Sequence, residues 1–295
     1  MFDMSDIWQL YALGAIFATC VENITDKAGI RAPIDTLVAT FIRVATYSVL
    51  VPTLCFIFGQ PLTFYVSPGI VVFGVASTAM ASVYTLTIKK VDVTTFSLLS
   101  YIGPLCFLAI DNVIGSGINL YQSLGVCGLV LGGMLFLSNG TLKLDKITIS
   151  ALLFLVTFSG SEAYYLKYLV LTENISGISV LASIWVWAAL FLGCAVIAKG
   201  KLPLIFDNRT VTYVKYSATA KTFDATSSIL TGVALTQTTV SQFSALDVFF
   251  PPMMLMLAIA AQKWLKIDLG ESIDKKTVSK KGLATVVLII SGLMV

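Results

Sequence analysis

The sequence predicts an all-α, polytopic membrane protein with ten transmembrane helices arranged as two inverted five-helix repeats. Hydrophobic residues make up 57% of the 295 residues and charged residues only 12%, against about 25% charged residues in ordinary soluble domains. The apolar runs are of bilayer length, about 20 residues each. Two of these runs carry an acid and a lysine at the same spacing, Glu22 with Lys27 and Glu162 with Lys167. Together these observations predict a multi-pass membrane protein that arose by duplication.

Ten spans follow from the apolar runs and from the Gly, Pro and Asn residues that separate them. They cover residues 7–28, 34–58, 68–88, 93–114, 121–139, 148–171, 176–198, 211–235, 239–262 and 278–295. No soluble domain interrupts them. The chain is therefore expected to be an integral protein of the cytoplasmic (plasma) membrane, surrounded by membrane lipid.

The two halves, residues 1–145 and 146–295, can be laid over one another. Moving Glu22 and Lys27 forward by 140 positions reaches Glu162 and Lys167, and residues 94–104 align with residues 241–251 at an offset of 147. Each half has five spans, and repeats with an odd number of spans enter the membrane from opposite sides. Such symmetry predicts a substrate site near the midplane, between the halves, with access alternating from side to side.

Lysines and arginines gather in the connections that follow the odd-numbered spans. The opposite connections and both termini contain almost none. By the positive-inside rule, this asymmetry predicts that the basic connections face the cytoplasm and that both termini lie on the other side.

The chain contains no histidine, which removes the usual general base and the usual metal ligand. The five cysteines lie inside apolar segments without a Cys-x-x-Cys pair, as expected of small buried residues. No basic stripe with interleaved aromatic residues indicates nucleic-acid binding. The sequence therefore predicts no cofactor, no metal and no enzymatic activity. A membrane-embedded transferase and a scaffold protein remain alternatives from other classes.

The order of several diffuse motifs resembles the drug/metabolite transporter superfamily, in its EamA-like ten-span branch. The first span ends in a small-polar stretch before a lysine (residues 20–27), and the second carries Arg43 near its start. A proline interrupts the fourth span at Pro104 and its counterpart at Pro251, and residues 122–125 read Gln-x-x-Gly. The resemblance implies export or exchange of small organic solutes, often amino acids. It also implies cytoplasmic termini, in conflict with the charge pattern, and the glutamate expected before the fifth span is replaced by a serine.

The eighth predicted span carries a polar stripe at helical spacing, namely Ser217, Lys221, Asp224, Ser228 and Thr231. Lys221 and Asp224 are three positions apart and are expected to pair, which lowers the cost of burying both. The stripe is predicted to line a substrate pathway. The alternative is an internal ion pair that joins helices.

Glu22 and Glu162 are predicted to carry protons or to bind a cationic group, with a structural buried carboxyl as the alternative. Because Glu22 and Lys27 cannot share one helical face, Lys27 is expected to extend toward the membrane interface. Arg43 either binds a substrate carboxylate through its planar fork or ties spans together.

Asp247 lies four residues before Pro251, where the proline ring frees a backbone carbonyl. Pro104 and Pro251 are therefore candidate hinges, with packing bends as the alternative. Aromatic residues are candidate walls of the site. The full predicted substrate-binding set is Glu22, Arg43, Tyr84, Tyr101, Glu162, Tyr165, Trp185, Lys221, Asp224 and Asp247.

Acids and bases in one pathway favour a zwitterionic solute. The sequence thus predicts a secondary active transporter of small organic solutes, with amino-acid-like metabolites as the leading class and organic cations or drugs as the alternative. Its expected partners are the solute, and protons or a counter-substrate for coupling. Both a monomer and a homodimer are compatible with the sequence.

Overall fold

The computed structural model describes residues 7–30, 34–57, 61–90, 175–235, 249–267 and 275–292, with isolated positions among the intervening segments. The structure is all-helical, with 88% helix and no strand among the described residues, which confirms the predicted all-α class. The described elements are α1 (Ile7–Ile30), α2 (Thr36–Ile57), α3 (Pro68–Lys90), α8 (Gly177–Ala198), the 3-10 helix η2 (Leu202–Phe206), α9 (Asn208–Leu235), α11 (Phe250–Lys263) and α12 (Lys275–Gly292).

Four helices, α1, α2, α3 and α8, are long and apolar enough to cross a membrane. Their bounds agree within two residues with the predicted spans 7–28, 34–58, 68–88 and 176–198. α9 covers the predicted span 211–235 but is more polar, and α11 and α12 cover parts of the last two predicted spans. The predicted spans 93–114, 121–139 and 148–171 and the boundary between the two halves lie outside the continuously described residues.

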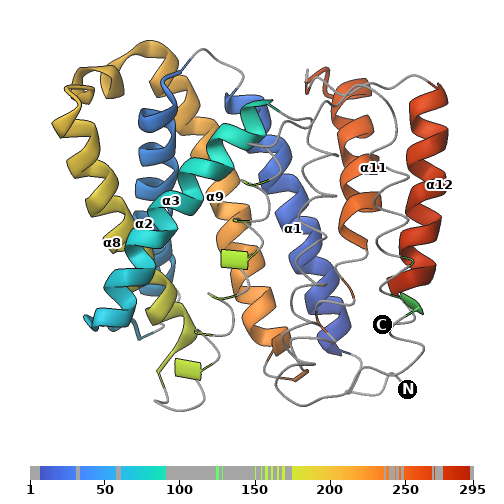
Figure 1. Cartoon of the computed structure of the whole chain (residues 1–295), viewed down its shortest axis with the longest axis horizontal. Helices are drawn as coiled ribbons and strands as arrows, with labels where there is room; N and C mark the ends of the chain where they lie inside the picture. The colour runs from blue at the N-terminus through green and yellow to red at the C-terminus, as the bar shows by residue number, and fades with distance from the viewer. Residues whose placement is uncertain are drawn as a thin grey trace.

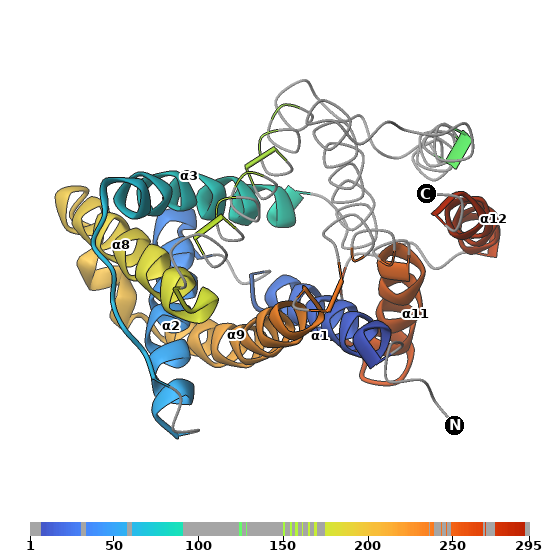
Figure 2. The same ribbon diagram turned by 90° about the horizontal axis from the view of Figure 1, so that it is seen from below.

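The helices run alongside one another in a bundle (Figures 1 and 2). α1 packs along α9, α2 packs between α8 and α9, and α3 crosses over α8. Apolar side chains fill the space between helices: Ile16, Cys20 and Ile24 of α1 pack on Met254 and Ala258 of α11. This packing brings α1, α2, α3 and α9 together around one common region.

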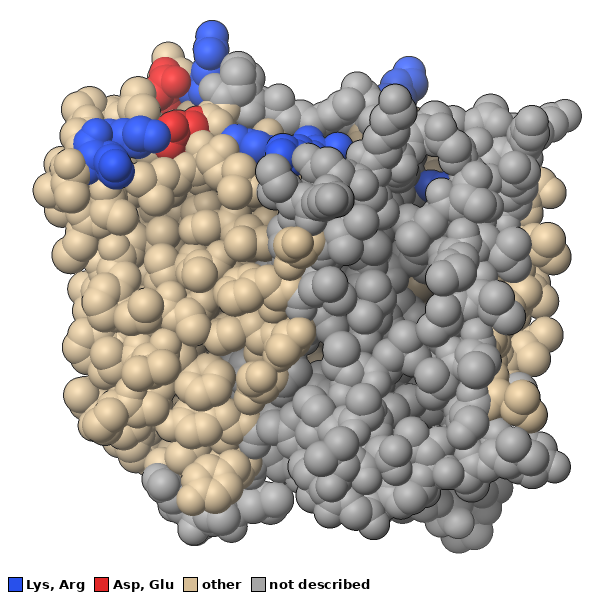
Figure 3. Space-filling view, viewed as in Figure 1, with Lys and Arg blue, Asp and Glu red and all other residues tan. Residues whose placement is uncertain are grey.

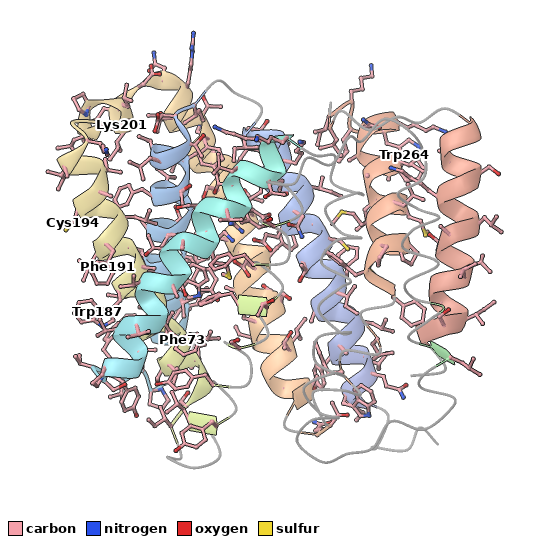
Figure 4. The ribbon with its side chains drawn as sticks, in the orientation of Figure 1. Phe73, Trp187, Phe191, Cys194, Lys201 and Trp264 are labelled. Atoms are coloured by element: carbon pink, nitrogen blue, oxygen red, sulfur yellow. The ribbon has the colours of Figure 1, made fainter. Side chains whose placement is uncertain are left out.

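The C-terminal ends of α1, α3, α8 and α11 all lie at the same end of the bundle (Figure 1). Figure 3 shows the charged residues of one face gathered at this end, above a broad uncharged surface. Trp264 follows α11 there and is 81% exposed (Figure 4), as is common for tryptophans at a membrane interface. The predicted basic connections that the structure describes thus share one end.

Threonine hydroxyls on the outer face of α9 bond to the helix's own backbone. Thr212, Thr219, Thr222 and Thr226 are exposed, and each donates to the carbonyl oxygen four residues earlier, at 2.8–3.1 Å. The polar atom of each side chain is therefore satisfied without water.

Asp35 fixes the connection between α1 and α2 at the basic end. Its Oδ1 accepts the backbone N–H groups of Leu37 (3.0 Å) and Val38 (3.2 Å), which caps the start of α2. Its Oδ2 pairs with Lys201 Nζ at 2.6 Å, in the segment that leads to α9. Lys89, in the last turn of α3, donates to the backbone oxygen of Ile34 at 2.7 Å. The α1–α2 connection, the α8–α9 connection and the end of α3 are thereby held together.

We expect the stability supplied by Asp35 to disappear in acid. Burial raises the pKa of this carboxyl, but the hydrogen bonds from Lys201, Val38 and Leu37 outweigh burial, so the pKa lies below its ordinary value. A lowered pKa means that the stabilisation is complete above the unfolded-state pKa and is lost as the pH falls through the folded-state pKa. The unfolding temperature of Asp35→Ala should lie below that of the wild type at neutral pH, for a cap loss of about 1 kcal/mol, and approach it in acid.

Asp35→Asn separates the two contributions, because asparagine also caps helices well. This variant should keep most of the neutral-pH stability and lose the acid dependence. An acid dependence equal to that of the wild type would show that other carboxyls cause it.

Candidate functional site

Two acids of α1 point into the region where the four helices meet. Glu22 and Asp26 are four residues apart, so they lie on one face of α1, one turn from each other. Their exposures are 5% and 0%. Acids this deeply buried need partners, since an isolated buried charge is strongly destabilising.

Arg43 of α2 bridges the two acids. Its Nη2 donates to Glu22 Oε1 at 2.9 Å, and its Nε donates to Asp26 Oδ2 at 2.7 Å. The planar guanidinium suits this two-point contact, because its donors are held in a rigid fork. Its Cζ also lies 3.6 Å from the centre of the Tyr84 ring of α3. The guanidinium is therefore held by contacts to both α1 and α3.

Lys221 of α9 completes the cluster from the opposite side. Its Nζ donates to Glu22 Oε1 at 2.5 Å and to Asp224 Oδ2 at 2.5 Å, which confirms the predicted pairing of Lys221 with Asp224. Lys221 is 3% exposed, whereas the Asp224 side chain is 27% exposed. Asp224 is therefore the most accessible of the five side chains that meet here. We call Glu22, Asp26, Arg43, Lys221 and Asp224 the ionic cluster.

Tyrosines surround the ionic cluster. The Tyr84 hydroxyl donates to Asn23 Oδ1 at 2.5 Å and lies 3.5 Å from Asp26 Oδ2. The Tyr47 ring centre lies 5.8 Å from Lys221 Nζ, and its hydroxyl is 3.2 Å from Ser228 Oγ. The cations are thus placed over electron-rich ring faces, an arrangement that favours positive charge.

The ionic cluster contains more acids than bases. Three carboxylates, Glu22, Asp26 and Asp224, face two basic groups, Arg43 and Lys221. With every group ionised, these five side chains carry one negative charge in excess. Lys27, one residue after Asp26 and 6% exposed, is a third basic group beside the cluster, so the acids and bases that the structure describes in this region are equal in number.

The predicted residues that the structure describes fall into two groups. Glu22, Arg43, Tyr84, Lys221 and Asp224 meet in or beside the ionic cluster. Trp185 forms the second group: it packs on the ring of Tyr47, with ring centres 5.4 Å apart, and so contacts a neighbour of the ionic cluster.

Tyr165 belongs to a different region. It stacks on Phe73 of α3, with ring centres 4.4 Å apart, in an apolar cluster between α3 and α8. Figure 4 shows Phe73 near the end of α3 remote from the basic connections, and Trp187 of α8 packs in the same apolar cluster. Pro251 lies in the first turn of α11, a position that suits proline. Tyr101, Pro104, Glu162 and Asp247 lie outside the described residues.

The prediction for Lys27 is wrong. Its side chain is 6% exposed and donates to the backbone oxygen of Ile88 at 2.5 Å, instead of extending to water. The end of α3 passes close to the last turn of α1 and offers a carbonyl that has no partner within its own helix. Lys27 is therefore a link between two helix ends.

Three site residues were missed by the sequence argument: Asn23, Asp26 and Tyr47. Asp26 carried a usable signal, because it lies one helical turn after Glu22. Tyr47 lies one turn after Arg43 in the same way. A search of the positions one helical turn before and after each predicted charged residue would have found both.

No family model and no curated protein matches this sequence. The fold is similar to that of a protein in a solved crystal structure, with a TM-score of 0.68 over 97% of this chain and 96% of that chain. The two sequences are 12% identical, so the likeness concerns the fold alone.

Proposed function

We propose that this protein is a secondary active transporter of small organic solutes, with amino-acid-like metabolites as the leading substrate class. The observation that carries the proposal is the ionic cluster, buried where α9 meets α1 and α2, two helices that are long and apolar enough to cross a membrane. Ionisable groups inside membrane helices are costly and usually mark a path for a substrate or an ion. A purely structural ion pair needs only one acid and one base, whereas this cluster has five members from three helices.

The exchange of ion-pair partners gives such a site a means of changing conformation. The ammonium group of a solute can replace Lys221 at Asp224, the most accessible carboxylate of the ionic cluster. Lys221 bridges α9 and α1 through Glu22, so a change in its contacts alters how these two helices are joined. Binding at Asp224 is thereby coupled to the packing of α9 on α1, as alternating access requires.

The proposal also includes the arrangement of the whole chain in the membrane. It comprises ten spans, two inverted repeats, and membership of the drug/metabolite transporter superfamily. The common basic end of α1, α3, α8 and α11 supports a cytoplasmic location for that end. In this arrangement the ionic cluster lies toward the cytoplasmic end of the bundle, because Asp26 is four residues from the end of α1 and Arg43 is seven residues after the start of α2.

An organic-cation exporter is the second candidate. The ring faces of Tyr47 and Tyr84, which already lie near Arg43 and Lys221, suit cationic groups and favour a cation over a zwitterion. Competition experiments separate the two candidates: amino acids should inhibit flux in the first case, and hydrophobic cations in the second.

Replacing Asp224 by asparagine should abolish solute flux and leave the fold intact. The side chain is partly exposed and holds only one ion pair within the cluster, so its loss should change the unfolding temperature little. Flux into vesicles containing the purified variant should fall at least tenfold. The matched control is Asp207→Asn, which removes an exposed acid from the connection before α9.

A substrate has first to be found, by screening metabolites for those that raise the unfolding temperature of the wild type. If Asp224→Asn transports the hit as fast as the wild type does, the ionic cluster is not the substrate site. If no solute is transported by either protein, the transport proposal itself is wrong.

A further inference from the structure

Three buried polar atoms next to the ionic cluster have no hydrogen-bond partner within the described part of the chain. They are Asp26 Oδ1, the Tyr213 hydroxyl and Ser217 Oγ. All three residues are 0% exposed. Buried polar groups are almost always paired, so three unpaired oxygens in one neighbourhood indicate a ligand.

The register of α1 against α9 places these atoms opposite one another. Thr19 of α1 contacts Ser227 of α9, and Glu22, further along α1, contacts Lys221, which comes earlier in α9. Further along, a Cβ on Gly29 would lie 3.0 Å from the Tyr213 ring. The helices are therefore antiparallel neighbours, as Figures 1 and 2 also show.

Asp26 lies between Glu22 and Gly29 on α1, and Ser217 lies between Lys221 and Tyr213 on α9. The same register therefore sets Asp26 across from Ser217, with Tyr213 one turn further along. Ser217 also differs from the threonines of α9. Those bond to their own helix, whereas the Ser217 hydroxyl remains available.

The chemistry of these atoms selects a small cation. One carboxylate oxygen and two hydroxyl oxygens are hard ligands, which suit alkali and alkaline-earth ions. Asp26 contributes a carboxylate, and a carboxylate set against two hydroxyl groups favours a cation over a water molecule. The site is closed to solvent, which favours a bare ion over an organic group.

We infer that the interface of α1 and α9 contains a binding site for a monovalent inorganic cation of the sodium class, formed by Asp26, Tyr213 and Ser217. The site shares Asp26 with the ionic cluster. Because Asp26 Oδ2 is held by Arg43, an ion on Oδ1 is coupled through that carboxylate to the groups around Glu22. The inference concerns binding only and does not rest on the proposed transport.

The test is the unfolding temperature of the purified full-length protein in sodium chloride and in choline chloride of equal concentration and pH. A ligand that binds only the folded state raises this temperature with increasing concentration. Sodium should do so and choline should not. Asp26→Asn should abolish the sodium effect, and Ser217→Ala and Tyr213→Phe should each weaken the apparent affinity about tenfold.

Thr222→Ala is the matched control, since it removes a hydroxyl from the exposed face of the same helix. It should retain the full sodium response. Equal stabilisation by sodium and choline would overturn the inference, as would a sodium response unchanged in both Ser217→Ala and Tyr213→Phe. A response to pH alone, without sodium, would assign a proton to Asp26 instead and also overturn it.

Discussion

Replacing Arg43 by methionine should be among the most damaging single changes in the described chain. The substitution retains an unbranched apolar side chain but leaves Glu22 and Asp26 without the guanidinium that bridges them. Removing one partner from a buried ion pair costs about 3–5 kcal/mol. We expect a large fall in the unfolding temperature of the purified protein and a low yield of folded protein.

Two further variants test whether the lost bridge causes the loss of stability. Arg43→Lys restores the charge without the fork and should recover only part of the stability. Arg209→Met removes an exposed arginine before the core of α9 and should change stability by no more than about 0.5 kcal/mol. If Arg43→Met and Arg209→Met unfold at the same temperature, the bridge contributes nothing to stability.

Replacing Gly29 by alanine should separate α1 from α9. The added Cβ would lie 2.5 Å from the Cβ of Tyr216, an atom fixed to the backbone that cannot rotate away. Relief requires movement of a whole helix, and overpacking of this kind costs about 1–3 kcal/mol. The movement would also lengthen the contact between Lys221 and Glu22. We therefore expect a lower unfolding temperature together with weaker substrate binding.

Gly232→Ala is the matched control on α9, because a Cβ there meets nothing within 4 Å. Alanine favours a helix over glycine by about 1 kcal/mol, so this variant should be as stable as the wild type or more so. An equal gain in both glycine variants would show that the two helices do not approach as closely as the structure indicates.

The sequence anticipated the helices whose apolar length is unbroken. α1, α2, α3 and α8 were predicted within two residues because hydropathy alone decides where such helices begin and end. The polar stripe on α9 was predicted from its spacing, and the structure directs it inward: Ser217 and Lys221 are buried, and Thr222 on the other face is exposed.

Contacts between distant helices could not be predicted in the same way. Lys27 was expected to extend toward the membrane interface because it cannot share a face with Glu22 and lies near the end of its span, yet its acceptor is Ile88, 61 residues away. Likewise, Arg43 was expected either to bind substrate or to tie spans together. Its two contacts to α1 support the second role without testing the first. The pairing of helices in space, which sequence periodicity does not contain, decides both cases.

The self-bonded threonines of α9 have a consequence for the way this helix meets lipid. A hydroxyl that points back to its own carbonyl turns the methyl group of the side chain outward. The face formed by Thr219, Thr222 and Thr226 is consequently closer to an alanine or valine surface than its composition implies. A hydropathy scale gives every threonine the same value and so underestimates how apolar the outer face of this helix is. Counting spans by average hydropathy therefore underestimates the lipid-compatible surface of this bundle.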